Sequence, residues 1–111
     1  PVAVAVPEMG MCTDYDETVR LPRGIVKDYP FGTSRVMVYY RLNPETPGAV
    51  ELQWYFGGTL AGQQPMTPQV GYNFGWISAQ SALPVGDYAA AIALPGPIEL
   101  RRVQFRVLAS P

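Results

Sequence analysis

The sequence contains no histidine and a single cysteine, Cys12, and these two scarcities exclude several kinds of chemistry. Histidine is the commonest general base near neutral pH and the commonest ligand of transition metals. Without it, the chain cannot assemble a Ser-His-Asp or Cys-His catalytic group on its own. One cysteine also excludes an internal disulfide and a multi-cysteine zinc site. We therefore expect no enzyme activity, no catalytic residues, no cofactor and no metal site.

Charge is also sparse. Only 15% of the 111 residues are charged, and eight basic residues are mixed with nine acidic ones. Binding to nucleic acid requires clustered lysine or arginine, but the longest basic run here is Arg101-Arg102. No stretch approaches the roughly 20 apolar residues that cross a bilayer. We therefore expect no nucleic-acid partner and no membrane span within this chain.

Apolar residues, proline and glycine are what the chain has in quantity. Apolar residues make up 48% of it, enough for a buried core, while 12 prolines and 11 glycines interrupt both helices and strands. Prolines break nearly every window long enough for a helix. We expect residues 1–111 to form one domain. Because residue 1 is Pro rather than Met, we expect a processed product or an excised domain.

Alternation of apolar and polar residues predicts the strands. In 35–42 the apolar positions are even-numbered, from Val36 to Leu42, and in 49–56 they are again even, from Val50 to Phe56. Shorter or weaker patterns predict strands at 2–6, 9–13, 59–63, 72–79, 88–94 and 98–108. The segment 14–30 lacks periodicity and is predicted to be a long loop. The chain is thus predicted to be an all-β, single antiparallel β-sandwich of about seven strands.

The last predicted strand has an irregular pattern. Ile98 and Leu100 are even-numbered, whereas Val103, Phe105 and Val107 are odd-numbered. Because strand side chains alternate with a period of two, one extra residue is needed to turn all five inward. The pattern predicts a β-bulge near Arg101-Arg102.

Leu83-Pro84-x-Gly86-x-Tyr88, an alternating strand, a hairpin and Phe105-Arg106-Val107 follow one another at the end of the chain. This series resembles the closing hairpin of bacterial immunoglobulin-like or fibronectin-III-like modules. The resemblance implies a tyrosine corner at Tyr88, whose hydroxyl would bond nearby backbone, and core positions for Trp54 and Phe105. It concerns architecture, because the immunoglobulin-like disulfide is missing and a shared sandwich implies no shared function.

A second resemblance rests on the order Cys12, Tyr39-Tyr40, Trp54, Gly86-x-Tyr88, Phe105-x-Val107. This order is similar to that of an uncharacterised family of bacterial extracytoplasmic β domains. It implies a periplasmic or secreted location.

Exposed aromatic residues are the candidates for a partner or ligand surface. Tyr39 and Tyr55 are predicted on outward faces of neighbouring strands, with Trp76 not far along the chain. We expect Trp54, Phe74, Trp76 and Phe105 to fill the core, since each lies on the apolar side of an alternating run. Trp76 therefore has two interpretations, a core residue and part of an aromatic platform.

Three other features carry weaker hypotheses. Asp14, Asp16 and Glu17 offer hard oxygen ligands for Ca²⁺, but without EF-hand spacing we expect a solvated loop. Glu51 faces outward without a carboxylate partner, which argues against a glycosidase. Cys12 is expected to be a small buried apolar residue.

These observations predict a function in binding. The first hypothesis is a non-catalytic, extracytoplasmic accessory or adaptor domain of bacterial origin that contacts another protein. The second is a carbohydrate-binding module that uses Tyr39, Tyr55 and Trp76. The third is a structural subunit of a larger assembly or filament.

Overall fold

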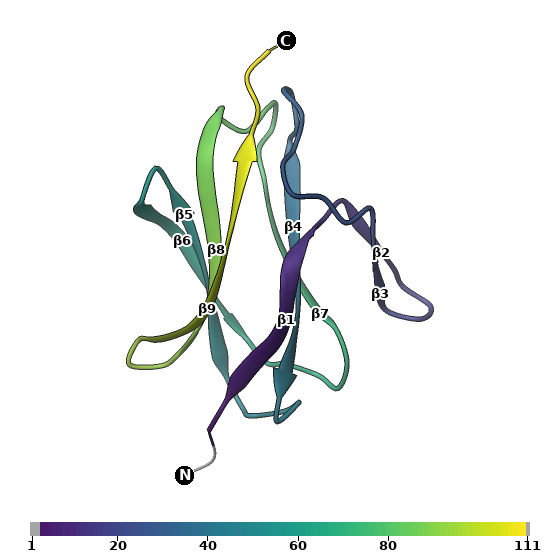
Figure 1. Cartoon of the computed structure of the whole chain (residues 1–111), viewed down its shortest axis with the longest axis vertical. Coiled ribbons are helices and arrows are strands. Elements are labelled where there is room, and N and C mark those ends of the chain that lie inside the picture. Colours follow the sequence, from purple (N-terminus) through teal and green to yellow (C-terminus); the bar gives the residue numbers. More distant parts are fainter. Residues whose placement is uncertain (1–2, 111) are drawn as a thin grey trace.

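The computed structural model describes residues 3–110, which contain strands, turns and no helix (Figure 1). The region therefore holds no helix able to cross a membrane. Nine strands occur among these residues. They are β1 (Ala5–Cys12), β2 (Asp14–Asp16), β3 (Leu21–Arg23), β4 (Arg35–Asn43), β5 (Val50–Phe56), β6 (Thr59–Met66), β7 (Asn73–Ser78), β8 (Gly86–Leu94) and β9 (Ile98–Val107).

The strands form three antiparallel sheets. One sheet has the order β1-β4-β7, the second has the order β6-β5-β8-β9, and the third is the short pair β2-β3. In Figure 1 the two larger sheets face each other in a sandwich-like arrangement, while β2 and β3 project from the outer side of β4. The prediction of an all-β chain with antiparallel sheets is confirmed.

The main core lies between the two larger sheets. It includes most of the residues predicted to point inward from both sheets, with Trp54 and Tyr40 among the largest side chains that are fully buried. Trp54 packs edge-to-face against Phe105 at 6.3 Å between ring centroids. Phe56 and Ile98 were expected inward but are 38% and 59% exposed, because each is the terminal residue of its strand at the rim of the core.

Two stretches differ from the predicted strands. The segment 14–30 is not one long loop, since it contains the β2-β3 pair, so the strand count is nine rather than about seven. The predicted strands 2–6 and 9–13 are one strand, β1, although Val2 lies outside the described residues. Pro7 fits inside β1 because the pairing with β4 shifts register between Ala5 and Glu8.

The irregularity predicted in β9 lies beside Arg101. Ile92 pairs with Arg101 and Ala93 pairs with Glu99, so Leu100 is the extra residue. The bond that the resemblance implies for Tyr88 is also present. The Tyr88 hydroxyl donates to the carbonyl of Pro84, and its ring stacks on Phe105 at 5.2 Å.

Candidate functional site

Three alanine side chains of β8 line the outer face of the β6-β5-β8-β9 sheet. Ala89, Ala91 and Ala93 alternate along β8 on the side opposite the core residues Tyr88, Ala90 and Ile92. All three are at most 5% exposed, although they belong to an outer face. Because methyl groups are small, longer side chains of the neighbouring strands β5 and β9 can lie over this stripe.

On β5, three outward residues form a chain of hydrogen bonds. The Tyr55 hydroxyl donates to Oε1 of Gln53 at 2.9 Å, and Nε2 of Gln53 donates to Oε1 of Glu51 at 2.7 Å. Spacing of two along a strand places all three side chains on one face. These bonds restrict Tyr55 to one orientation above the alanine stripe.

From β9, Arg102 reaches across the stripe toward β5. Its guanidinium carbon lies 4.3 Å from the centre of the Tyr55 ring, within the range of a cation–π interaction. The same guanidinium is paired with Glu99 at 2.7 Å. We call the outward residues of β5, β8 and β9 that surround this contact the Tyr55–Arg102 face. They are Glu51, Gln53, Tyr55, Ala89, Ala91, Ala93, Arg102 and Gln104.

A depression of about 430 Å³ adjoins this face. Its charged lining consists of Lys27, Asp28, Asp87, Arg102 and Arg106, so both signs are present. Asp28 accepts hydrogen bonds from the backbone N–H and the guanidinium of Arg106, each at 3.0 Å. The bond from the Arg106 side chain is the main cause that lowers the pKa of Asp28 below its usual value.

The outer face of the β1-β4-β7 sheet is largely covered. Cys12, Met37 and Tyr39 are buried there in a second apolar cluster, against which Tyr72 and Phe74 pack. Tyr15 of the β2-β3 pair stacks on Phe74 with 4.3 Å between ring centroids. The prediction that Tyr39 is exposed is therefore wrong. Its side chain does point outward, but the β2-β3 pair and neighbouring aromatic rings cover it.

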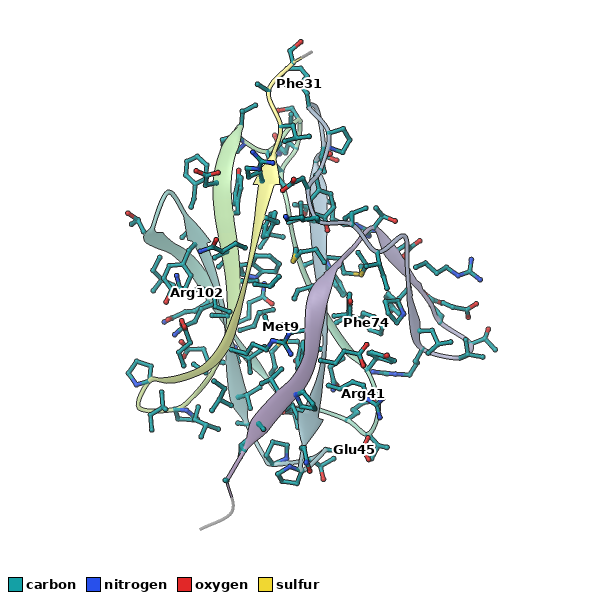
Figure 2. All side chains as sticks on the ribbon, in the orientation of Figure 1. Met9, Phe31, Arg41, Glu45, Phe74 and Arg102 are labelled. Carbon is teal, nitrogen blue, oxygen red and sulfur yellow. The ribbon has the colours of Figure 1, made fainter. Side chains whose placement is uncertain are left out.

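The three residues predicted to form one ligand surface are separated. Tyr55 belongs to one sheet, whereas Tyr39 and Trp76 belong to the outer face of the other. In Figure 2, Arg102, which contacts Tyr55, lies at the left of the molecule, and Phe74, which packs against the cluster that contains Tyr39, lies to its right. Trp76 is 47% exposed and Phe74 lies in the second cluster, so neither fills the main core as expected.

The two aspartates of the predicted acidic loop, Asp14 and Asp16, lie in β2 and form hydrogen bonds with nearby residues. Asp16 accepts hydrogen bonds from the N–H groups of Thr18 and Val19 and pairs with Arg23, and the first of these bonds is the main cause that lowers its pKa. Asp14 accepts from the N–H of Tyr15. Over residues 3–110, no three His, Cys, Asp or Glu side chains are placed to hold a metal ion together.

Cys12 is fully buried, as expected for a small apolar residue. Burial raises the pKa of its thiol to about 11, so it is protonated at neutral pH. A thiol in this state is a poor nucleophile.

Sequence reasoning missed Arg102 and the alanine stripe. The run Tyr88-Ala89-Ala90-Ala91-Ile92-Ala93 predicts a strand, but alanine suits either face, so it does not predict which residues point outward. In the sequence, the adjacent pair Arg101-Arg102 was the feature that could have pointed to Arg102 as a surface residue of interest. No protein-family model matches this sequence, and no curated protein shows significant similarity to it.

Proposed function

We propose that this chain is a non-catalytic accessory or adaptor domain that binds another protein through the Tyr55–Arg102 face. The observation that carries this proposal is the ordered tyrosine–arginine pair above a floor of alanine, beside a depression. Tyrosine and arginine are enriched in protein interfaces and among the residues that contribute most to affinity. Because Tyr55 is already held by Gln53, little side-chain entropy would be lost on binding.

The proposal includes an immunoglobulin-like or fibronectin-III-like architecture, which its strand order supports. In this proposal the sheet order β1-β4-β7 corresponds to strands A, B and E of such a module, and the order β6-β5-β8-β9 corresponds to strands C′, C, F and G. The Tyr88–Pro84 bond supports the same assignment. Such modules commonly act through contacts, and we propose a bacterial, periplasmic or secreted location on the resemblance described above.

A carbohydrate-binding function has less support. An aromatic platform requires several rings on one accessible surface, but Tyr39 is buried and Tyr55 lies on the other sheet. Trp76 alone is left as an exposed ring among the three. Glycan-array binding by the native chain that Trp76→Ala abolishes would favour this function over the adaptor.

The adaptor proposal is tested by capture of a partner from an extract of the source cells, followed by titration calorimetry with the purified partner. We expect Arg102→Ala to weaken binding by more than about tenfold, since truncation of a central arginine typically costs about 2 kcal/mol or more. Val70→Ala is the matched control, because Val70 is 69% exposed in the loop between β6 and β7. Equal affinities of the two variants, or no partner for the native chain, would contradict the proposal.

A further inference from the structure

Four strands lie at the edges of the two larger sheets, namely β1 and β7 in one and β6 and β9 in the other. An edge strand presents unpaired backbone groups, and proteins usually protect it with proline, charge, an irregularity or a covering segment. β1 contains Pro7 and a register shift, and Val26 bonds to it at Met11. β6 contains Pro65 and a register shift of its own. Both edges are protected.

The edge of β9 is charged and partly covered. Arg106 accepts a hydrogen bond from the N–H of Tyr29 at 2.8 Å, and its own N–H donates to Asp28. Arg101 donates to the carbonyl of Val6 on β1 at 2.9 Å. This edge is therefore joined to the other sheet through β1 and to the segment that contains Tyr29.

The remaining edge, β7, lacks the proline, the charge and the irregularity that protect the other edges. Its sequence, Asn-Phe-Gly-Trp-Ile-Ser, contains no charge and no proline, and its pairing with β4 has no irregularity. Trp76, at its centre, is 47% exposed. An uncharged, flat edge strand with an exposed aromatic residue is the kind that pairs with another chain.

Two hydrogen bonds establish which backbone groups of β7 point to the open side. The backbone N–H of Ala79 donates to the carbonyl of Ser34 at 2.8 Å, which continues the β4–β7 pairing. The backbone N–H and C=O groups of odd-numbered residues in this stretch therefore point toward β4. The Gln64 side chain donates to the carbonyl of Trp76 at 3.3 Å. The backbone N–H and C=O groups of even-numbered residues therefore point away from β4. Both groups of one strand residue point to the same side. The open edge is thus formed by the backbone of Phe74, Trp76 and Ser78.

We propose that β7 pairs antiparallel with β7 of a second copy of this chain, with Trp76 opposite Trp76. The open groups recur every second residue and are symmetric about Trp76, so this register also places Phe74 opposite Ser78 of the second copy. Each of these three residue pairs would exchange two backbone hydrogen bonds. If the pairing were centred on Phe74 instead, Ser78 would lie opposite a residue outside β7 of the second copy and would have no strand partner there.

The chemistry of β7 favours its own copy as the occupant. Like charges placed opposite each other destabilise a sheet, and a pair of β7 strands contains none. Opposite residues lie about 4.5–5.5 Å apart at Cβ, so the two exposed Trp76 rings would cover each other. The result is a two-fold dimer whose sheet continues from β1-β4-β7 into its copy. Pairing requires the Gln64 side chain to release the Trp76 carbonyl, to which it is bonded in the described residues.

Sedimentation equilibrium over micromolar to millimolar concentrations tests this association. We expect the native chain to dimerise and Trp76→Lys to weaken the dimer by more than about tenfold, because it places two ammonium groups opposite each other. Val70→Lys is the control, since it adds the same charge at an exposed apolar position outside β7. We expect it to dimerise like the native chain.

Cross-linking gives a second test that does not depend on Trp76→Lys being folded. Opposite residues of a hydrogen-bonded antiparallel pair have Cα atoms about 5.5 Å apart, which suits a disulfide. Trp76→Cys should therefore form a disulfide-linked dimer under mild oxidation faster than Val70→Cys. Cys12 is buried and would not compete.

Three results would overturn the inference. They are a native chain that is monomeric throughout, equal association of the two lysine variants, and equal cross-linking of the two cysteine variants. A monomer that instead takes up an extended peptide at β7 would assign this edge to a different partner. The dimer is independent of the Tyr55–Arg102 face, so Arg102→Ala should leave it unchanged.

Discussion

The hydroxyl groups of two buried tyrosines, Tyr29 and Tyr40, differ in their hydrogen bonding. The Tyr29 hydroxyl donates to the carbonyl of Cys12 and accepts from the N–H of Met37 at 3.3 Å. It thus lies beside Cys12 and Met37, the last residue pair of the β1–β4 ladder, and it bonds to backbone groups of both strands. The Tyr40 hydroxyl, in contrast, is buried in the main core and has no hydrogen-bond partner among the described residues.

At the residue scale we therefore expect opposite effects from the same substitution. Tyr29→Phe should lower the free energy of unfolding by about 2 kcal/mol, because it removes the hydrogen bonds of the Tyr29 hydroxyl to two buried backbone groups. Tyr40→Phe should be neutral or should stabilise by up to about 1 kcal/mol, since it removes a desolvated hydroxyl. Urea denaturation of the two variants measures this difference. A larger loss for Tyr40→Phe would show that its hydroxyl is paired in solution.

At the element scale, the β2-β3 pair acts as a cover for β4. It brings Tyr15 onto Phe74 and encloses the cluster around Cys12 and Tyr39. Its own strands are three residues each, and Arg20 ties the turn between them to the carbonyl of Tyr72 at 2.8 Å. The pair is thus held mainly by contacts to the sheet, because a two-stranded hairpin is marginal alone.

Removal of the stacked ring should open this cover. We expect Tyr15→Ala to raise the rate at which a thiol reagent labels Cys12 by more than about tenfold, which corresponds to a loss of about 1.4 kcal/mol in the opening free energy. Val19→Ala, at a residue 59% exposed in the same hairpin, is the control and should label slowly. Equal labelling rates would mean that the hairpin does not protect the thiol.

The long strands could be predicted from the sequence, but the β2-β3 pair that covers one of them could not. The alternation in β4 and β5 reflects a core on one side, and it holds regardless of what lies elsewhere. Asp14–Asp16 and Leu21–Arg23 have no alternation, and aspartate and proline are disfavoured in strands. The alternation therefore predicts correctly that the Tyr39 side chain points outward. It does not predict that this side chain is buried, because its burial depends on residues distant in sequence. The separation of Tyr39 from Tyr55 likewise depends on sheet order, which alternation does not specify.

At the scale of the whole molecule, the three buried acidic groups with large pKa shifts make stability fall at alkaline pH. Burial raises the pKa of Tyr29 and of Tyr40 to about 12 and that of Cys12 to about 11. Ordinary values are about 10 for tyrosine and 9.0 for this cysteine. A raised pKa means that folding favours the protonated form. The corresponding stability is fully present below the unfolded pKa and is lost as pH rises through the folded pKa.

We expect the free energy of unfolding to begin to fall near pH 9 and to fall more steeply from about pH 10 to 12. Denaturant titrations at a series of pH values measure this profile. Tyr40→Phe should reduce the steep part, because one of the two tyrosines no longer ionises on unfolding. A profile that is unchanged between pH 8 and 11 would show that these groups are accessible in the folded chain.

Tyr29 also has a mechanical consequence. Its backbone bonds to Arg106 of β9 at 2.8 Å and to Leu108, just after β9, at 2.9 Å, while its hydroxyl bonds to β1 and β4 of the opposite sheet. Sliding of one sheet over the other must break the bonds at one end or the other of this single residue. The sandwich is therefore resistant to shear at the β1–β9 side. Its more compliant side is the one where, among the described residues, the hydrogen bond from the Gln64 side chain is the one that links β6 to β7.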